Sequence, residues 1–197
     1  MKFFKKLYDW VLHWAETPYG PLALFLLAFV ESSVFPIPPD PLLIALCLGA
    51  IKKSWRFALF ASVASVLGGM LGYLIGYALW DAVSSFFFEY IPGFSVDKFQ
   101  YVLGHYQEQG FLYVFLAGLT PIPYKIFTIA SGVFKMNFPL FVLASAISRS
   151  LRFFGVAALF WKFGPSIKEF IDKYFNILGW AFFILLFGGF LVIKYLI

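Results

Sequence analysis

Two apolar runs, separated by a proline-rich turn, lie in the first third of the chain. Residues 20–35 are almost wholly apolar, and a second apolar run, 42–51, follows a turn that contains Pro36, Pro38 and Pro39. Proline interrupts a helix because it lacks a backbone donor and restricts the residue before it. Neither run alone reaches the roughly 20 residues that a membrane-spanning helix needs. The pattern therefore predicts a re-entrant hairpin, whose broken centre is tolerated at membrane depth only where protein buries it or it lines a wet cavity.

Longer apolar stretches follow, and they cover residues 54–80, 138–163 and 177–197. Each is long enough to cross a bilayer as a helix. Between the first two lies a polar connection, 81–110, in which an amphipathic helix is expected over 95–109. Residues 111–134 then repeat the short–broken–short pattern around Pro121 and Pro123.

The N-terminal residues 1–16 predict an interfacial amphipathic helix. Phe3, Leu7 and Trp10 gather on one side of such a helix, whereas charged residues lie mostly elsewhere. Aromatic rings at the headgroup level are typical of helices that lie on a membrane. A cleavable signal peptide needs an unbroken apolar stretch after its basic residues, and Asp9, His13 and Glu16 interrupt that stretch here, so none is indicated.

The two halves of the chain can be aligned, and the matched positions are Pro36 with Pro121, Pro38 with Pro123, Gly49 with Gly132 and Gly72 with Gly155. Repeat 1 covers 20–80 and repeat 2 covers 111–163, each a broken hairpin followed by a long helix. Each repeat crosses the membrane once, so the second is expected to be inverted relative to the first. Inverted repeats with broken helices are an architecture of secondary transporters.

Composition agrees with a membrane protein of one domain. Of the 197 residues, 62% are hydrophobic and 13% are charged, against about 45–50% apolar and 25% charged residues in soluble domains. The net charge of +5 is too small to indicate nucleic-acid binding, and one cysteine excludes a disulfide scaffold. The fold class predicted is an all-α polytopic membrane protein.

Loop charges predict the topology. Lys52, Lys53 and Arg56 share a side with the N-terminal lysines, and this side is expected to be cytoplasmic because lysine and arginine concentrate there. The acidic connection 81–110 then lies outside. Residues 177–197 either cross once more, which places the C-terminus outside, or insert partly.

Ionisable residues inside the apolar segments are the candidate functional residues, and they are Glu31, Asp40, Lys125, Arg149 and Arg152. On insertion scales each costs about 2.5–3.5 kcal/mol at the bilayer centre, and such residues are usually functional. Their formal charges sum to +1, which suits one anionic phosphate headgroup. The alternative is that they only neutralise one another as structural ion pairs.

Individual roles can be expected for these residues. Asp40 precedes Pro41, as an N-cap would, and Lys125 occupies the matching place in repeat 2, so a direct Asp40–Lys125 pair is expected. Arg149 and Arg152 lie three residues apart and share a helix face, and guanidinium groups suit phosphate recognition. Glu31 is a candidate for proton-linked transport.

Small residues form a stripe on the first long helix, at Gly68, Gly72 and Gly76. Such spacing is typical of close helix packing. Enzyme chemistry is not indicated, because His13 and His105 are the only histidines and neither lies in a spanning segment. No metal-binding motif is present in the sequence, and no cofactor is expected.

The stretch from Phe29 to Asp40, with an acid, a proline-rich turn and a second acid, resembles the DedA family, also called the VTT-domain or SNARE-associated Golgi protein family. The glycine-rich segment 68–76 resembles the next motif of that family, and Pro121 with the pair Ser131-Gly132 resembles its second hairpin. The resemblance covers roughly residues 20–163. It implies transport or scrambling of lipids in the bacterial inner membrane, with undecaprenyl phosphate and phospholipids as candidates.

The chain departs from this family at two positions. Many members carry an arginine three residues before the first proline of the second hairpin and another three residues after it, where this chain has Gly118 and Tyr124. Lys125, Arg149 or Arg152 could supply the missing charge.

The sequence thus predicts a multi-pass transporter of an anionic lipid, of flippase or scramblase type, with possible proton coupling. One alternative is a proton-coupled antiporter of a small ion. The other is a membrane assembly factor that transports nothing and whose buried charges are structural.

Overall fold

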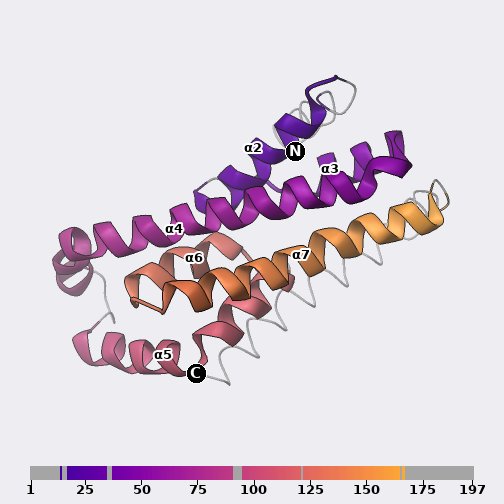
Figure 1. Ribbon diagram of the computed structural model, residues 1–197. Helices are drawn as coiled ribbons and strands as arrows, with labels where there is room; N and C mark the ends of the chain where they lie inside the picture. The colour runs from indigo at the N-terminus through magenta and orange to yellow at the C-terminus, as the bar shows by residue number, and fades with distance from the viewer. Residues whose placement is uncertain are drawn as a thin grey trace.

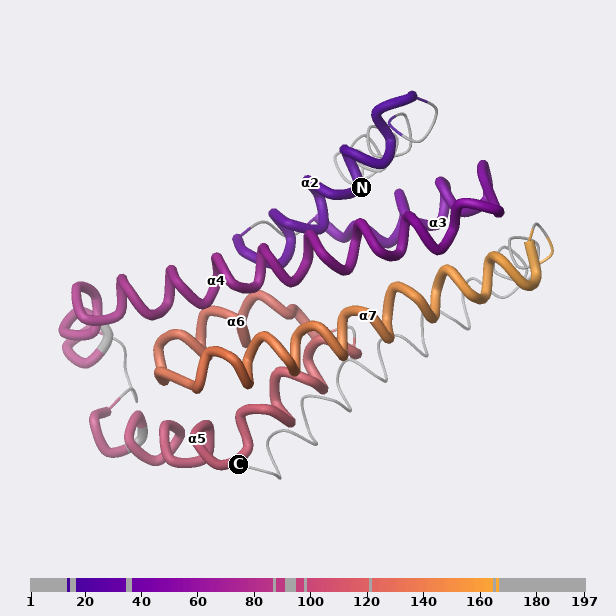
Figure 2. The backbone as a smooth tube through the Cα atoms, in the orientation of Figure 1, coloured from indigo at the N-terminus to yellow at the C-terminus, as the bar shows by residue number. Residues whose placement is uncertain are grey.

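The computed structural model describes residues 14, 17–34, 37–90, 95–120, 122–164 and 166, except the side chains of residues 87 and 98. Within these ranges the regular elements are all helical (Figures 1 and 2). They are α2 (Gly20–Ser33), α3 (Asp40–Gly49), the 3₁₀ turn η1 (Ile51–Lys53), α4 (Ser54–Tyr90), α5 (Val96–Leu119), α6 (Tyr124–Val133) and α7 (Phe138–Phe163).

Among the described residues, two helices are long and apolar enough to cross a membrane. The first runs over Ile51–Tyr90 and consists of η1 and α4 together. The second is α7. At about 1.5 Å per residue, α4 alone is roughly 55 Å long, which exceeds the hydrocarbon thickness of about 30 Å. A helix of this length either tilts in the bilayer or extends beyond it.

Helix ends differ from the sequence expectation between the two halves. The helix predicted over 54–80 continues to Tyr90, because the polar residues after position 80 include neither proline nor glycine before Pro92. Helix α5 runs unbroken from Val96 to Leu119. The expected helix over 95–109 and the first limb of the second hairpin are therefore one element, since polarity changes near Gly110 but the backbone stays helical.

Local signals explain where α7 begins. The side chain of Asn137 caps the helix by accepting a hydrogen bond from the backbone nitrogen of Leu140 at 3.1 Å, and a proline lies in the first turn. A capping amide satisfies one of the donors that a helix start leaves unpaired, and proline is tolerated there. The helix begins at Phe138 and ends at Phe163, the bounds expected from the sequence.

Helix α4 forms the spine of the fold and packs against α2, α6 and α7 (Figure 1). A first hydrophobic cluster joins α2, α3, α4 and α7 and includes Leu24, Leu43 and Phe153. A second cluster joins α4, α5, α6 and α7 and includes Tyr113 and Phe141. These clusters bring the end of α2, the start of α3 and the middle of α7 together.

Glycines allow the backbones to approach closely along α4. A Cβ atom added at Gly68 would meet the carbonyl oxygen of Phe29 in α2, and one added at Gly76 would meet that of Ile129 in α6. At Gly72 the obstacle would be the Thr128 hydroxyl. The glycine stripe therefore lies where α4 contacts α2 and α6.

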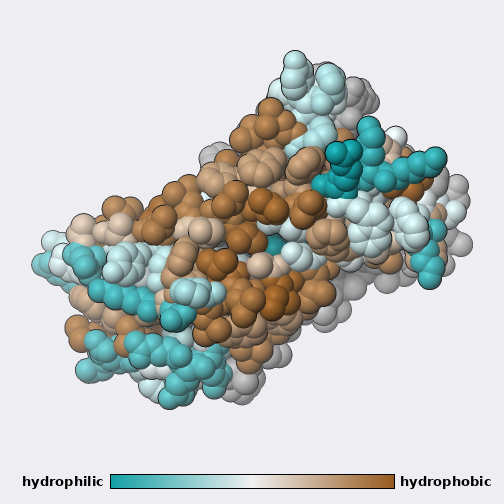
Figure 3. All heavy atoms as spheres, viewed as in Figure 1, coloured by the Kyte–Doolittle hydropathy of each residue, from teal (hydrophilic) through white to brown (hydrophobic). Residues whose placement is uncertain are grey.

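The surface carries an apolar belt. Figure 3 shows hydrophobic residues across the middle of the molecule, with hydrophilic residues gathered towards the two ends. Exposed apolar side chains on α2, α4 and α7 include Leu26, Leu59 and Leu151, each more than half exposed. An apolar area of this extent marks a membrane-facing surface.

Some expectations concern residues outside the described ranges. These are the interfacial helix over 1–16, apart from Trp14, the helix over 177–197, and Pro36 and Pro121. The re-entrant character of the hairpins and the inversion of the repeats stay predictions.

Candidate functional site

Two arginines of α7 pair with the two acids of the first hairpin. Arg149 Nη2 lies 3.0 Å from Glu31 Oε2, and Arg152 Nη2 lies 2.9 Å from Asp40 Oδ2. Glu31 belongs to the last turn of α2, and Asp40 is the first residue of α3. The two ion pairs therefore tie both limbs of the hairpin to one helix.

Helix geometry explains why the pairs lie side by side. Residues three apart share a helix face, so Arg149 and Arg152 present their guanidinium groups in neighbouring positions. Glu31 lies in the last turn of α2 and Asp40 begins α3, and both carboxylates face α7. Four charges that are distant in the sequence are thereby gathered at one place.

Asp40 does not act as the N-cap of its own helix. The N-cap position is Pro39, and no side chain caps α3. The Asp40 carboxylate instead accepts a hydrogen bond from Arg152. A charge-assisted bond to guanidinium is stronger than a neutral one, and this offers a reason for the preference.

Arg149 is almost fully buried, with 2% of its side chain exposed. Its Nε donates to Ser65 Oγ at 2.6 Å, and its guanidinium carbon lies 4.9 Å from the centroid of the Tyr124 ring and 4.7 Å from that of Phe153. Aromatic faces attract cations, most strongly where water is excluded. Helices α2, α4, α6 and α7 thus all contact this guanidinium.

Hydroxyl groups extend this network. Ser32 Oγ lies 2.6 Å from Ser65 Oγ and donates to Glu31 Oε2 at 3.2 Å. Thr128 Oγ1 donates to the carbonyl of Ser32 at 3.2 Å. A buried ion pair is stable only when further hydrogen bonds satisfy its remaining polar atoms. Ser32 provides such a bond to Glu31, and Ser65 provides one to Arg149.

Arg152 lies in a more open environment. Its side chain is 23% exposed, and that of its partner Asp40 is 24% exposed. Arg152 Nη1 also donates to the carbonyl of Thr120 at 3.0 Å, just beyond the end of α5. The C-terminal end of a helix carries partial negative charge, which favours a cation there. This second pair joins α3, α5 and α7 and can be reached from outside.

The expected pair between Asp40 and Lys125 is wrong. Lys125 Nζ donates to the carbonyl of Val34 at 3.4 Å, and Asp40 pairs with Arg152. Lys125 lies in the first turn of α6, near the end of α2, whereas the Asp40 carboxylate turns towards α7. The two hairpin tips therefore contribute their charges to different partners.

The other tip prolines delimit helices. Pro39 is buried and precedes α3, whereas Pro38 is exposed. Pro123 is exposed and occupies the N-cap position of α6.

Gly118 and Tyr124, the positions that depart from the resembled family, both contact Arg149. A Cβ atom added at Gly118 would meet Ser148 and would lie 3.5 Å from Arg149 Cδ. The Tyr124 ring stacks on the guanidinium, and its hydroxyl donates to Ser145 Oγ at 2.5 Å. The Arg149 side chain thus occupies the space next to both positions.

Sequence reasoning missed several partners of the arginines, namely Ser32, Ser65, Phe153 and the carbonyl of Thr120. Serine and phenylalanine are common in membrane helices, so their presence alone carries no signal. A backbone carbonyl has no sequence signature at all. The regular spacing of Ser65, Gly68 and Gly72 on one face of α4 was the only available hint.

Comparison with known proteins gives one family. The profile of the VTT domain matches residues 37–162. An uncharacterized protein of Haemophilus influenzae is 34% identical over 194 residues, which is 98% of this chain and 100% of the relative. An uncharacterized protein of Histophilus somni is 36% identical over 194 residues, which again is 98% of this chain and 100% of the relative.

A more distant relative comes from an archaeon. An uncharacterized protein of Methanocaldococcus jannaschii is 25% identical over 135 residues, which cover 68% of this chain and 79% of the relative. No solved structure matches the chain.

Proposed function

Because this chain belongs to the VTT-domain family, also called the DedA family, we propose that it moves an anionic lipid across the bacterial inner membrane as a flippase or scramblase. Undecaprenyl phosphate and phospholipids are the candidate substrates. Membership of this family of membrane proteins and the two helices of spanning length support the proposal.

One observation carries the proposal: two arginine–carboxylate pairs lie side by side on α7 within an otherwise apolar protein. The two pairs are neutral together, and Lys125 beside the end of α2 adds one positive charge. A phosphate diester, which carries one negative charge, can therefore enter without leaving an excess of negative charge, and a phosphate monoester can do so in its singly charged form. Guanidinium groups bind such oxygens through paired hydrogen bonds.

Exposure assigns different roles to the two arginines. Arg149 is buried and its contacts come from four helices, so it positions the helices around the site. Arg152 is about a quarter exposed, and its partner Asp40 is equally exposed. In this proposal the headgroup phosphate replaces Asp40 as the partner of Arg152.

In this proposal, protons are coupled to transport through that exchange. Protonation of Asp40 removes its negative charge and weakens its bond to Arg152. An anionic headgroup then competes more successfully for the guanidinium, so acid favours the bound state. Release of the proton restores the pair and expels the headgroup.

The test is reconstitution into phosphatidylcholine vesicles that contain a trace of headgroup-labelled phosphatidylglycerol or phosphatidylcholine. We expect wild-type protein to expose the anionic probe to a membrane-impermeant quencher, and Arg152→Gln to reduce that rate by about tenfold, the effect of roughly 1.4 kcal/mol. Arg152→Lys retains part of the activity because the charge remains. The matched control is Lys162→Gln, which removes an exposed cation from the end of the same helix.

The other two functions predict different results. A proton-coupled antiporter would move no lipid but would dissipate a pH gradient when a suitable cation is supplied. An assembly factor would do neither. Equal loss of both lipid probes in Arg152→Gln would mean that this arginine does not select the anionic headgroup, and would contradict the proposal of an anionic substrate.

A further inference from the structure

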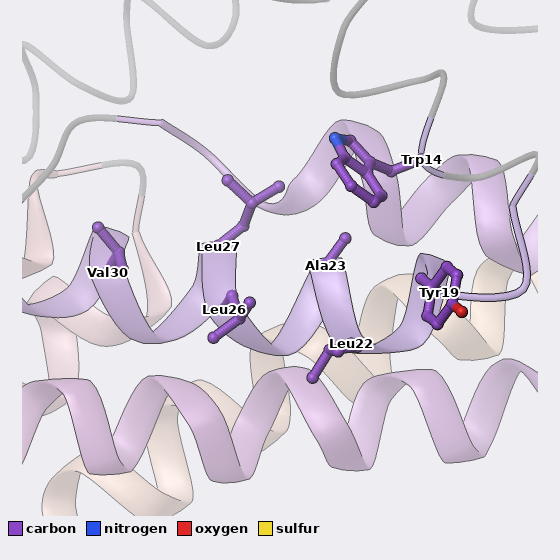
Figure 4. A pocket seen from close by; sticks show the side chains of 7 residues that line it. All are labelled: Trp14, Tyr19, Leu22, Ala23, Leu26, Leu27 and Val30. Atoms are coloured by element: carbon purple, nitrogen blue, oxygen red, sulfur yellow. The ribbon is translucent and has the colours of Figure 1, made fainter.

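A groove runs along the outer face of α2, between this helix and Trp14 (Figure 4). Its volume is about 470 Å³. Ala23 and Leu27 point to the same side as Trp14, and the lining extends from Tyr19 to Val30. The described residues of this lining are five with aliphatic side chains and two with aromatic rings. The two arginine pairs of the proposed site do not contribute to it.

We propose that this groove binds one hydrocarbon chain of a membrane phospholipid that stays with the protein. The proposal goes beyond the proposed function, because a resident lipid requires no transport. It can also be tested separately from the proposed function, since lipid binding can be measured without lipid movement.

The length of the groove matches one leaflet. From Tyr19 to Val30 a helix rises about 16 Å at 1.5 Å per residue. The hydrocarbon core of a bilayer is about 30 Å thick, so one leaflet supplies chains of about half that length. An extended chain from a single leaflet would therefore fill the groove from end to end.

The two ends of the groove differ in the way that a phospholipid chain requires. Tyr19 lies at one end and its side chain is 63% exposed, and Trp14 lies opposite Ala23 in the same half of the groove (Figure 4). Tryptophan and tyrosine concentrate at the level of the lipid headgroups. The other end is the aliphatic Val30, so the chain enters beside the aromatic rings and its methyl end reaches Val30.

Enclosure distinguishes this groove from the rest of the apolar belt. Leu59 in α4 and Leu151 in α7 are as exposed as Leu22 and Leu26 in α2, but neither of them lines the groove. A chain between Trp14 and α2 contacts protein on more than one side, so it gains more dispersion contacts than one on an open helix face. Exchange with bulk lipid should therefore be slower here.

The experiment uses the full-length protein in phosphatidylcholine–phosphatidylglycerol nanodiscs with a trace of phospholipid that carries a photoreactive diazirine in one acyl chain. After illumination, mass spectrometry locates the labelled peptides. We expect the segment 19–30 to be labelled about fivefold more than the exposed face around Leu151, which corresponds to about 1 kcal/mol of preference. Equal labelling would mean ordinary contact with surrounding lipid and would overturn the proposal.

Ala23→Phe fills the groove and should reduce labelling of the segment 19–30 by about fivefold. Ala78→Phe is the matched control, because Ala78 is an exposed alanine of α4 that does not line the groove. If Ala23→Phe fails to fold, Val30→Phe at the other end tests the same point, since Val30 is 39% exposed. Unchanged labelling in a folded variant would show that no chain occupies the groove.

Failure of this proposal and failure of the proposed function are distinguishable. Selective labelling without lipid movement in vesicles would retain the groove and reject the flippase. Lipid movement with uniform labelling would support the flippase and reject the lipid-binding groove.

Discussion

The guanidinium of Arg149 donates a hydrogen bond to the carboxylate of Glu31 at 3.0 Å, across 118 residues of sequence. The bond joins the middle of α7 to the end of α2. Arg149 is 2% exposed and Glu31 is 18% exposed, so water replaces neither partner easily. This pair is therefore as much a structural tie as a candidate part of the transport site.

Removal of the carboxylate should destabilise the fold. Glu31→Ala leaves the Arg149 charge buried without its ionic partner, and such changes cost about 3–5 kcal/mol in soluble proteins. Glu31→Gln should cost less, because its amide oxygen can still accept from the guanidinium. The free energy of unfolding in detergent micelles measures both. Glu89→Ala, at an exposed position in α4, is the control and should change little.

A double variant separates the ion pair from simple loss of packing. In Glu31→Leu combined with Arg149→Met no buried charge remains, and apolar replacement of buried pairs is often neutral. We expect the double variant to recover most of the stability lost in Glu31→Leu. If the two effects simply add, the pair contributes no coupling and the tie between α2 and α7 lies elsewhere.

Asp40→Asn should affect function more than stability. The pair with Arg152 is about a quarter exposed, and pairs of this kind contribute roughly 0–1 kcal/mol. The variant lacks the charge that competes with a headgroup for Arg152. Lipid movement by this variant should therefore become nearly independent of pH. A variant that keeps the wild-type pH profile would exclude Asp40 as the proton-responsive group.

The sequence predicted which charged residues belong to the site better than it predicted which of them form ion pairs with one another. Proline, glycine and hydropathy patterns placed α7 at Phe138–Phe163, because a capping asparagine and a long apolar run both act locally. The five charged residues within apolar segments were visible because a charge is costly in lipid. Which acid pairs with which base depends on the rotation of each helix about its axis, and periodicity alone does not determine that rotation.

The extent of α4 and α5 was missed for a different reason. Polar residues after position 80 suggested a connection, but polarity ends a membrane span and not a helix. Helical backbone continues through the polar residues as far as Tyr90. A hydropathy boundary and a helix boundary coincide only where a helix-breaking residue also lies there, as Pro39 does immediately before α3.

Close approach of α4 to α6 gives a further prediction. A Cβ atom at Gly76 would meet the carbonyl of Ile129, and backbone cannot move aside as a flexible side chain does. Gly76→Ala should therefore lower the free energy of unfolding by about 1–3 kcal/mol, as overpacking does. In Gly155→Ala the new methyl group meets nothing within 4 Å, so this matched change should be neutral or slightly stabilising. Equal effects of the two changes would mean that α4 and α6 are not in close contact.

Gly118 tests why this chain carries its buried arginine on α7. A Cβ atom there would collide with the side chain of Ser148, and it would lie 3.5 Å from Arg149 Cδ. Gly118→Ala should consequently destabilise the protein by about 1–3 kcal/mol, and addition of Ser148→Gly should relieve most of that loss. The coupling between the two changes is measured from a double-mutant cycle of unfolding free energies.

Gly118→Arg extends the same argument. An arginine at 118 would need the space that Ser148 and Arg149 now fill, so the single change should abolish recovery of folded protein from detergent extracts. Gly118→Arg combined with Ser148→Gly and Arg149→Ala removes both obstacles and restores one guanidinium to the site. Recovery of folded, monodisperse protein by the triple variant would show that α5 and α7 offer alternative positions for one buried charge. Normal folding of Gly118→Arg alone would contradict the close contact between these helices.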